Sequence, residues 1–176
     1  TRRERIRGAT REEILATAWK QIAEQGAASL SLRAIAREMG ITAPGLYRYY
    51  PSRDDLVTAL IVNAFNSFSD ALEVARDACP QDAHADRYRA ICKAYFQWGA
   101  QNPSCYLFIF GTPVSGYQMS EQAQPSAQRG FLVQQGVIGE AYKAGFVNPP
   151  EGDIKLSRDL LARYKYLGQI GMPYPP

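Results

Sequence analysis

An all-α protein is predicted by two features of this sequence. Apolar residues recur at spacings of three and four along most of the chain, which is the period of a helix that buries one face. Alternating runs rich in Val, Ile and Thr, which would indicate strands, are nearly absent. With 176 residues, of which 46% are hydrophobic, the chain is also long enough to bury a core.

Three helices are predicted within residues 1–51, each preceded by a hydroxyl residue that can cap its N-terminus and followed by a glycine or a proline that ends it. They span about Thr10–Gln25 with Thr10 as the cap, Leu32–Met39 capped by Ser31, and Ala43–Tyr49 capped by Thr42.

Further helices are expected after residue 51, where apolar residues again recur on one face of each segment. Ser52 can cap a long helix that continues to about Asp77. The others span about Asp86–Ala100, Ser104–Phe110, Ser126–Ala144 and Asp153–Leu167. Loops containing proline are predicted over Cys79–Ala85 and Gly111–Pro125. Residues 1–51 and 52–176 are therefore predicted to form two helical domains.

Residues 31–50 fit a helix-turn-helix, in which two short helices pack at a steep angle. Ala36 is small enough for the second of these helices to approach closely. Gly40 suits the left-handed backbone that ends the first one. The apolar residues expected between the two helices are Ile35, Met39, Ile41, Leu46 and Tyr49.

The outward face of the second helix in this motif suits a DNA groove. Small residues let a helix descend into a major groove, and a Thr or Ala methyl group can meet the methyl group of thymine. A tyrosine and an arginine beside them are placed for phosphates. These outward residues are Thr42, Ala43, Pro44, Gly45, Tyr47 and Arg48. The alternative is a tight helical hairpin that binds no ligand.

Positive charge is concentrated in the first third of the chain. Residues 1–58 contain ten Lys and Arg against seven Asp and Glu, whereas residues 59–176 contain ten of each kind. A flexible basic arm at the start could neutralise phosphates, although a solvated and partly disordered tail has the same composition. The arginines of this arm are Arg2, Arg3, Arg5, Arg7 and Arg11.

The run from Leu30 to Leu56, LSLRAIAREMGITAPGLYRYYPSRDDL, resembles the helix-turn-helix signature of the TetR (tetracycline-repressor) family. This resemblance implies an N-terminal three-helix DNA-binding domain followed by a helical domain for ligand binding and dimerisation. It implies base contacts for Thr42, Ala43, Pro44 and Gly45, and DNA-backbone contacts for Tyr47, Arg48, Ser31 and Arg33. Arg53 stands where the family often has a lysine and is expected to contact phosphate, as are Arg3 and Arg5 of the basic arm.

A second resemblance involves residues 95–103, YFQWGAQNP, and residues 106–117, YLFIFGTPVSGY. They are similar to the WHG type of C-terminal domain, which is attached to many regulators of this family. The Trp-His-Gly residues of that domain would lie in a final helix beyond residue 173, so we expect this helix to be missing from the present sequence.

Aromatic residues on or beside three of the predicted helices could surround a mostly apolar ligand cavity. Filling of the core is the alternative for each of them. The candidate pocket residues are Phe65, Phe68, Tyr95, Trp98, Phe108, Phe110 and Tyr117.

Together these features predict a ligand-responsive transcriptional repressor, which binds a palindromic operator in double-stranded DNA and is released by an unidentified small molecule. A homodimer is expected because one recognition helix buries little surface and a two-fold site needs two. A transcriptional activator of the same fold and a helical protein-interaction module without DNA binding are the alternatives. Small residues that would permit close helix contact in a dimer are Ala127, Gly130, Gly136, Gly139 and Ala141.

Catalytic, metal-binding and membrane functions are not expected. His84 is the single histidine, so neither a catalytic triad nor a multi-histidine metal site can be built around it. The three cysteines are widely spaced, and we expect no disulfide framework and no cofactor. No run of about 18 apolar residues could span a bilayer, and a cytoplasmic location is therefore expected.

Overall fold

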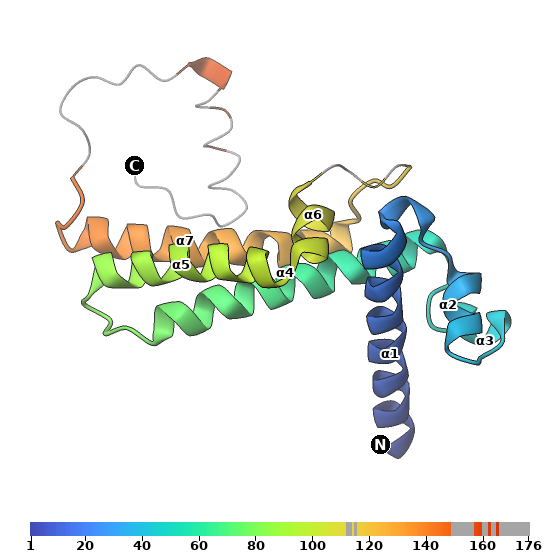
Figure 1. Ribbon diagram of the computed structural model, residues 1–176. Helices are drawn as coiled ribbons and strands as arrows, with labels where there is room; N and C mark the ends of the chain where they lie inside the picture. Colours follow the sequence, from blue (N-terminus) through green and yellow to red (C-terminus); the bar gives the residue numbers. More distant parts are fainter. Residues whose placement is uncertain (112–113, 115, 149–156, 160–161, 163–164, 166–176) are drawn as a thin grey trace. The chain divides into compact units, whose positions relative to one another are not determined.

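The computed structural model describes residues 1–111, 114, 116–148, 157–159, 162 and 165, and over these the chain is helical without a β-strand (Figure 1). The prediction of an all-α fold is confirmed. No helix within the described residues is both long enough and apolar enough to cross a membrane. The helix predicted over Asp153–Leu167 falls mostly outside the described residues. The helices are α1 (Arg2–Gln25), the 3-10 helix η1 (Ala27–Ser29), α2 (Leu32–Glu38), α3 (Ala43–Tyr47), α4 (Arg53–Asp77), α5 (His84–Gln101), α6 (Pro103–Phe110), the 3-10 helix η2 (Glu121–Ala123) and α7 (Gln124–Lys143).

The first helix begins well before its predicted start, so the prediction that the basic N-terminal segment is a flexible arm is wrong. Helix α1 starts at Arg2, and the capping hydroxyl belongs to Thr1, which accepts a hydrogen bond from the backbone N–H of Glu4. The hydroxyl of Thr10, the predicted cap, instead donates to the carbonyl of Ile6 at 3.0 Å inside the helix. The reason lies in the composition of residues 2–7, which are mostly arginine and glutamate and therefore favour a helix.

The other described helices lie within a few residues of their predicted bounds. Helix α3 ends at Tyr47, α5 begins at His84 and α7 begins at Gln124. The predicted cap of α4 is confirmed, because Oγ of Ser52 accepts a hydrogen bond from the backbone N–H of Asp55 at 3.1 Å. The Asp55 carboxylate accepts in return from the backbone N–H of Ser52 at 2.9 Å.

The chain packs as two compact units. Unit 1 consists of Thr1–Ser67 and Gly99–Ala127, and unit 2 of Phe68–Trp98 and Gln128–Pro176. The domain boundary predicted between residues 51 and 52 stays a prediction, because packing alone does not test which residues act together in function.

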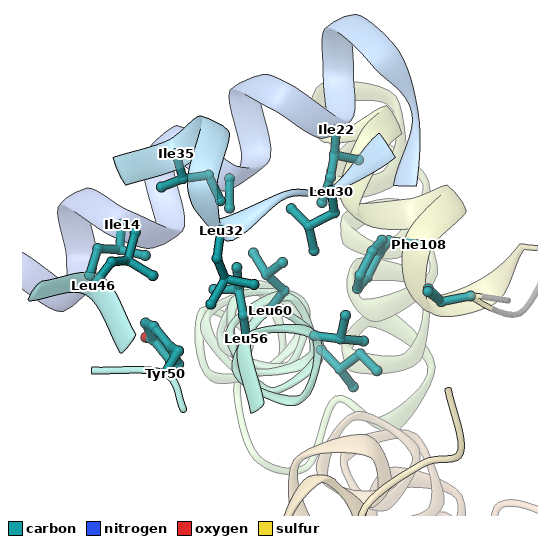
Figure 2. Packing of buried hydrophobic residues seen from close by; sticks show 14 of the residues in the cluster. Ile14, Ile22, Leu30, Leu32, Ile35, Leu46, Tyr50, Leu56, Leu60 and Phe108 are labelled. Carbon is teal, nitrogen blue, oxygen red and sulfur yellow. The ribbon is translucent and has the colours of Figure 1, made fainter. Parts of the chain in front are cut away.

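One apolar core holds unit 1 together. Figure 2 shows Leu46 of α3 beside Ile14 of α1, with Leu56 and Leu60 of α4 among the same buried side chains, and all four are 0% exposed. Helices as short as α2 and α3 are not stable alone in water, so burial of their apolar faces is what keeps them formed. The apolar residues predicted between these two helices are all buried or packed against the core: Ile35, Met39, Ile41, Leu46 and Tyr49.

Within unit 1, Trp19 ties α1 to α4 and α6. Its Nε1 donates to Oδ1 of Asn63 at 3.0 Å. Its ring forms a T-shaped pair with that of Phe108, with the two ring centroids 5.2 Å apart. Trp19 is partly buried, and Asn63 supplies the hydrogen-bond partner that an indole N–H needs when it is shielded from water.

An aromatic cluster forms part of the core of unit 2. Phe68 is 2% exposed and makes T-shaped contacts with Tyr95 and Trp98 at centroid distances of 5.1 and 5.2 Å. Gly130 of α7 lies against the same ring, since a Cβ atom built on it would come within 2.6 Å of Cε1 of Phe68. The absence of a side chain at Gly130 is therefore what admits the phenyl ring.

Ion pairs also join the helices of unit 2. The guanidinium of Arg87 on α5, whose side chain is 7% exposed, pairs with the carboxylate of Glu140 on α7 and donates to a backbone carbonyl at residue 81. Arg129 on α7 pairs with Asp70 and Glu73 on α4, both at 2.6 Å. The guanidinium of Arg87 is the buried member of these pairs, so loss of its carboxylate partner should cost more than loss of a partner of an exposed charge.

Candidate nucleic-acid interface

Helices α2 and α3 form the helix-turn-helix, and a hydroxyl side chain caps each of them. Oγ of Ser31 accepts from the backbone N–H of Ala34 at 3.4 Å, and Oγ1 of Thr42 accepts from that of Gly45 at 3.2 Å. Such a cap contributes about 1 kcal/mol, which is a large share for helices of seven and five residues. Both predicted caps are confirmed.

The turn between the two helices has the predicted backbone. Gly40 has a φ of 67°, in the left-handed region that glycine enters without steric cost. The backbone N–H of Ile41 then donates to the carbonyl of Ala36 at 3.0 Å. Ala36 itself is only 2% exposed, so a larger residue here would push the helices apart.

The first residues of α3 form the surface predicted to meet base edges. Thr42 and Pro44 are exposed, whereas Ala43 and Gly45 are half-buried. The hydroxyl oxygen of Thr42 already accepts the capping hydrogen bond, so the Thr42 O–H proton and methyl group are its main means of contacting a base. The remaining surface is small and apolar, which suits close approach more than hydrogen-bonded recognition.

Four further candidates lie on the same motif. Tyr47 is 40% exposed, and Arg48, which follows it as the C-cap residue of α3, is exposed as well. Arg33 is exposed on α2, while Ser31 is half-buried at the start of that helix. A tyrosine hydroxyl and two guanidinium groups in such positions are typical donors to phosphate oxygens.

The basic N-terminal segment is helical, because its arginines fall in the first turns of α1. Figure 1 shows the N-terminal part of α1 extending beyond α2 and α3. Arg5 is exposed on it, and the side chain of Arg3 lies outside the described residues. Further along α1, Nζ of Lys20 pairs with Oε1 of Glu38 on α2 at 2.6 Å. The hydrogen bond from Lys20 to Glu38, and then the Glu38 charge, raise the pKa of Lys20.

Arg53 lies differently from the other predicted phosphate contacts. It is half-buried at the first position of α4, and its guanidinium donates to two backbone carbonyls. Nε donates to that of Leu30 at 3.4 Å, and Nη2 to that of Ala27 at 3.3 Å. A phosphate contact by Arg53 stays a prediction, and the structure shows this side chain turned to the connection between α1 and α2.

Gln21 is a residue of this region that the sequence reading missed. It is 7% exposed on α1, and its Oε1 accepts a hydrogen bond from the backbone N–H of Ser31 at 3.0 Å. The available signal was its position, because Gln21 falls on the same helical face as Ile14, Ala18 and Ile22. A glutamine on an apolar face has to find a partner for its polar atoms.

Comparison with known proteins assigns the family. Residues 14–60 match the model described as bacterial regulatory proteins of the tetR family, and residues 88–164 match that of a tetracyclin repressor-like C-terminal domain. This chain belongs to the TetR family. Helix-turn-helix transcriptional regulators of Mycobacterium bovis and Mycobacterium tuberculosis are 37% identical to it over 141 residues, which is 80% of this chain. The match covers 58% of each relative, so this TetR-family chain spans little more than half their length.

Solved structures of TetR-family proteins and related regulators have the same fold. The regulatory protein SCO4313 is 35% identical, with a TM-score of 0.71 over 94% of this chain and 72% of that one. The TetR-family transcriptional regulator PfmR from Thermus thermophilus is 16% identical, with a TM-score of 0.59 over 93% of this chain and 88% of that one. The second likeness concerns the fold alone.

The predicted pocket residues of this TetR-family chain are distributed over both units. In unit 1, Phe65 and Phe110 pack edge-to-face at 5.8 Å, and Phe108 belongs to the same core. The Tyr117 hydroxyl hydrogen-bonds with Oγ1 of Thr58 at 2.9 Å and accepts from a backbone N–H at residue 120 at 3.2 Å. Phe68, Tyr95 and Trp98 form the cluster of unit 2. A shared ligand contact by the seven residues stays a prediction.

Each unit contains a pocket with room for a small molecule among its described residues. The larger, of about 490 Å³, lies in unit 2 and is lined mainly by apolar side chains, among them Tyr88, Val137, Ile138 and Phe146. The smaller, of about 250 Å³, lies in unit 1 and includes Phe108 among its lining residues. Small-molecule sites in proteins usually measure about 300–1,000 Å³, so the larger pocket has the usual size.

Proposed function

We propose that this chain is the DNA-binding and effector-binding part of a transcriptional repressor that acts as a homodimer on a palindromic operator. The observation that carries the proposal is the exposed face of α3, held on a buried core and flanked by Tyr47 and Arg48. Thr42, Pro44, Tyr47 and Arg48 are exposed, so the packing of the described residues leaves these side chains accessible to a partner. In a major groove this combination of small residues, tyrosine and arginine permits both close approach and phosphate contact.

The salt dependence of DNA binding tests this proposal. For a duplex, the logarithm of the binding constant falls against the logarithm of the salt concentration with a slope of about −0.9 per phosphate neutralised. Arg48→Ala should therefore weaken binding to every duplex and make this slope shallower by about 0.9. Lys93→Ala is the matched control, because Lys93 is an exposed basic residue on α5 in unit 2 and is not among the residues that line the larger pocket. Fluorescence anisotropy with a duplex selected by the wild-type protein from a random pool measures both quantities.

A protein that bound no duplex in a salt-dependent manner would contradict the proposal and favour a protein-interaction module. Sedimentation with and without DNA tests the dimer, and one protomer per operator would contradict that part. Transcription from a promoter that carries the selected site distinguishes repression from activation, because the two give opposite changes in transcript.

The effector part of the proposal has its own test. A small apolar molecule that binds unit 2 should raise the melting temperature, since any ligand that binds only the folded state stabilises it. Ile138→Trp would fill the larger pocket, whose lining includes Ile138. Leu132→Trp is the matched control, because Leu132 lies on the same helix with a similar exposure of 38% against 40%. Loss of the shift only in Ile138→Trp places the effector there, and a shift retained in both variants favours the aromatic cluster.

A further inference from the structure

The connection between α1 and α2, residues 26–31, is fixed by side chains from two different helices. From α4, Arg53 donates to the carbonyls of Ala27 and Leu30 at 3.3 and 3.4 Å. From α1, Gln21 accepts the backbone N–H of Ser31 at 3.0 Å. Both contacts end on the backbone, so they determine the path of the connection whichever side chains it carries.

This connection sets the position at which α2 begins. Ser31 is the residue whose hydroxyl caps α2, and its backbone N–H is the one that Gln21 holds. Leu30, beside it, is 4% exposed and anchored in the core of unit 1. A displacement of this segment therefore moves the start of α2, and through the buried contacts between α2 and α3 it moves the proposed recognition surface.

Arginine is the side chain that this arrangement needs. The planar guanidinium presents Nε–H and Nη–H groups in a fixed fork, so a single side chain can donate to two carbonyls at once. A lysine ammonium in the same place is a single centre on a flexible stem and cannot reproduce the fork. The two hydrogen bonds are long, but each is strengthened by the charge of the donor.

We infer that Arg53 is a positioning residue for DNA binding, which acts by holding the connection at Ala27 and Leu30 and not by contacting phosphate. The inference rests on the proposed function, and it assigns to Arg53 a role different from that of the exposed Arg48. Positive charge at residue 53 is then secondary, and the geometry of its donors is what matters.

The salt dependence of DNA binding separates these roles. Arg53→Ala should weaken binding about tenfold, the size expected for losing charge-assisted hydrogen bonds, while the salt slope stays at the wild-type value. Arg53→Lys should recover little of the loss, because it restores the charge without the fork. In Arg48→Ala the slope should become shallower by about 0.9, which shows that the assay detects a lost phosphate contact. The probe is the duplex selected by the wild-type protein.

Amide hydrogen exchange provides a second measurement without DNA. The amides of Ser31 and Ala34 should exchange faster in Arg53→Ala than in the wild type, whereas Arg48→Ala should leave them unchanged.

A salt slope that becomes shallower by about 0.9 in Arg53→Ala, together with recovery of affinity in Arg53→Lys, would overturn the inference in favour of a phosphate contact. Unchanged affinity of the folded Arg53→Ala protein, with a lower melting temperature, would overturn it in favour of a purely structural role. If wild-type protein shows no salt-dependent binding, the proposed function fails first and the inference falls with it.

Discussion

Replacing Gly130 and Gly136 by alanine should have opposite effects on stability, although both glycines lie on α7. Alanine is favoured over glycine inside a helix by about 0.8–1.0 kcal/mol. At Gly136 a Cβ atom meets nothing within 4 Å, so Gly136→Ala should gain this amount. At Gly130 the new atom would lie 2.6 and 2.9 Å from Cε1 and Cδ1 of Phe68. Neither separation is possible without displacing the ring.

The ring has little freedom to move. Phe68 is 2% exposed and is packed edge-to-face against Tyr95 and Trp98. Forcing an extra methyl group into a packed core costs about 1–3 kcal/mol. After the gain in helix propensity is subtracted from this cost, Gly130→Ala should lower the free energy of unfolding by roughly 0–2 kcal/mol. Because both variants gain the same propensity, their free energies of unfolding should differ by roughly 1–3 kcal/mol.

Urea unfolding followed by circular dichroism, at one protein concentration, measures this difference. The slope of the free energy with urea should be the same in both variants, because neither changes the surface exposed on unfolding. Equal stability of the two variants would refute the reasoning, since Phe68 would then have room to yield. A large loss of stability in Gly136→Ala would also refute it, and would indicate that Gly136 meets a second copy of the chain.

Three further predictions concern single side chains. Thr42→Ala should lower the free energy of unfolding by about 1 kcal/mol, measured in urea, because α3 loses its capping hydrogen bond; an unchanged value would contradict the cap. Burial raises the pKa of Tyr50, so this tyrosine ionises first in the unfolded chain as the pH rises. Stability should therefore fall above about pH 10. In thermal melts this fall should be smaller for Tyr50→Phe than for the wild type. Glu140→Ala leaves the buried guanidinium of Arg87 without its carboxylate. In the same urea assay this should lower the free energy of unfolding by roughly 1–3 kcal/mol. A change below about 0.5 kcal/mol would show that water replaces the lost partner.

The fold of the DNA-binding part could be predicted because its signals are local. Ser31 and Thr42 as caps, Gly40 in the turn and Leu46 as the buried residue all follow from neighbours a few positions away. The start of α1 differs from the prediction because the clustered arginines indicate a flexible basic arm by their charge, although arginine and glutamate are good helix formers. The charge of this segment indicates a flexible arm and its helix propensity indicates a helix, and the structure agrees with the propensity.

The candidate site was predictable to the extent that exposure follows from helical periodicity. Tyr47, Arg48 and Arg33 are exposed as that periodicity requires. The partners of Arg53 could not be predicted, because carbonyls more than twenty positions away in sequence leave no local signal. Nor could the pattern of aromatic residues show that Phe68 meets Gly130, since such contacts depend on how whole helices pack.

The positions of the two tryptophans have a practical consequence. The chain contains two tryptophans, and they lie in different units, Trp19 in unit 1 and Trp98 in unit 2. In Trp98→Phe protein the fluorescence would come from an indole near α1 and α4, and in Trp19→Phe protein from an indole in the aromatic cluster. Emission spectra of the two variants would therefore show, without any added label, which unit loses its structure first and which one responds when DNA or a small molecule is added.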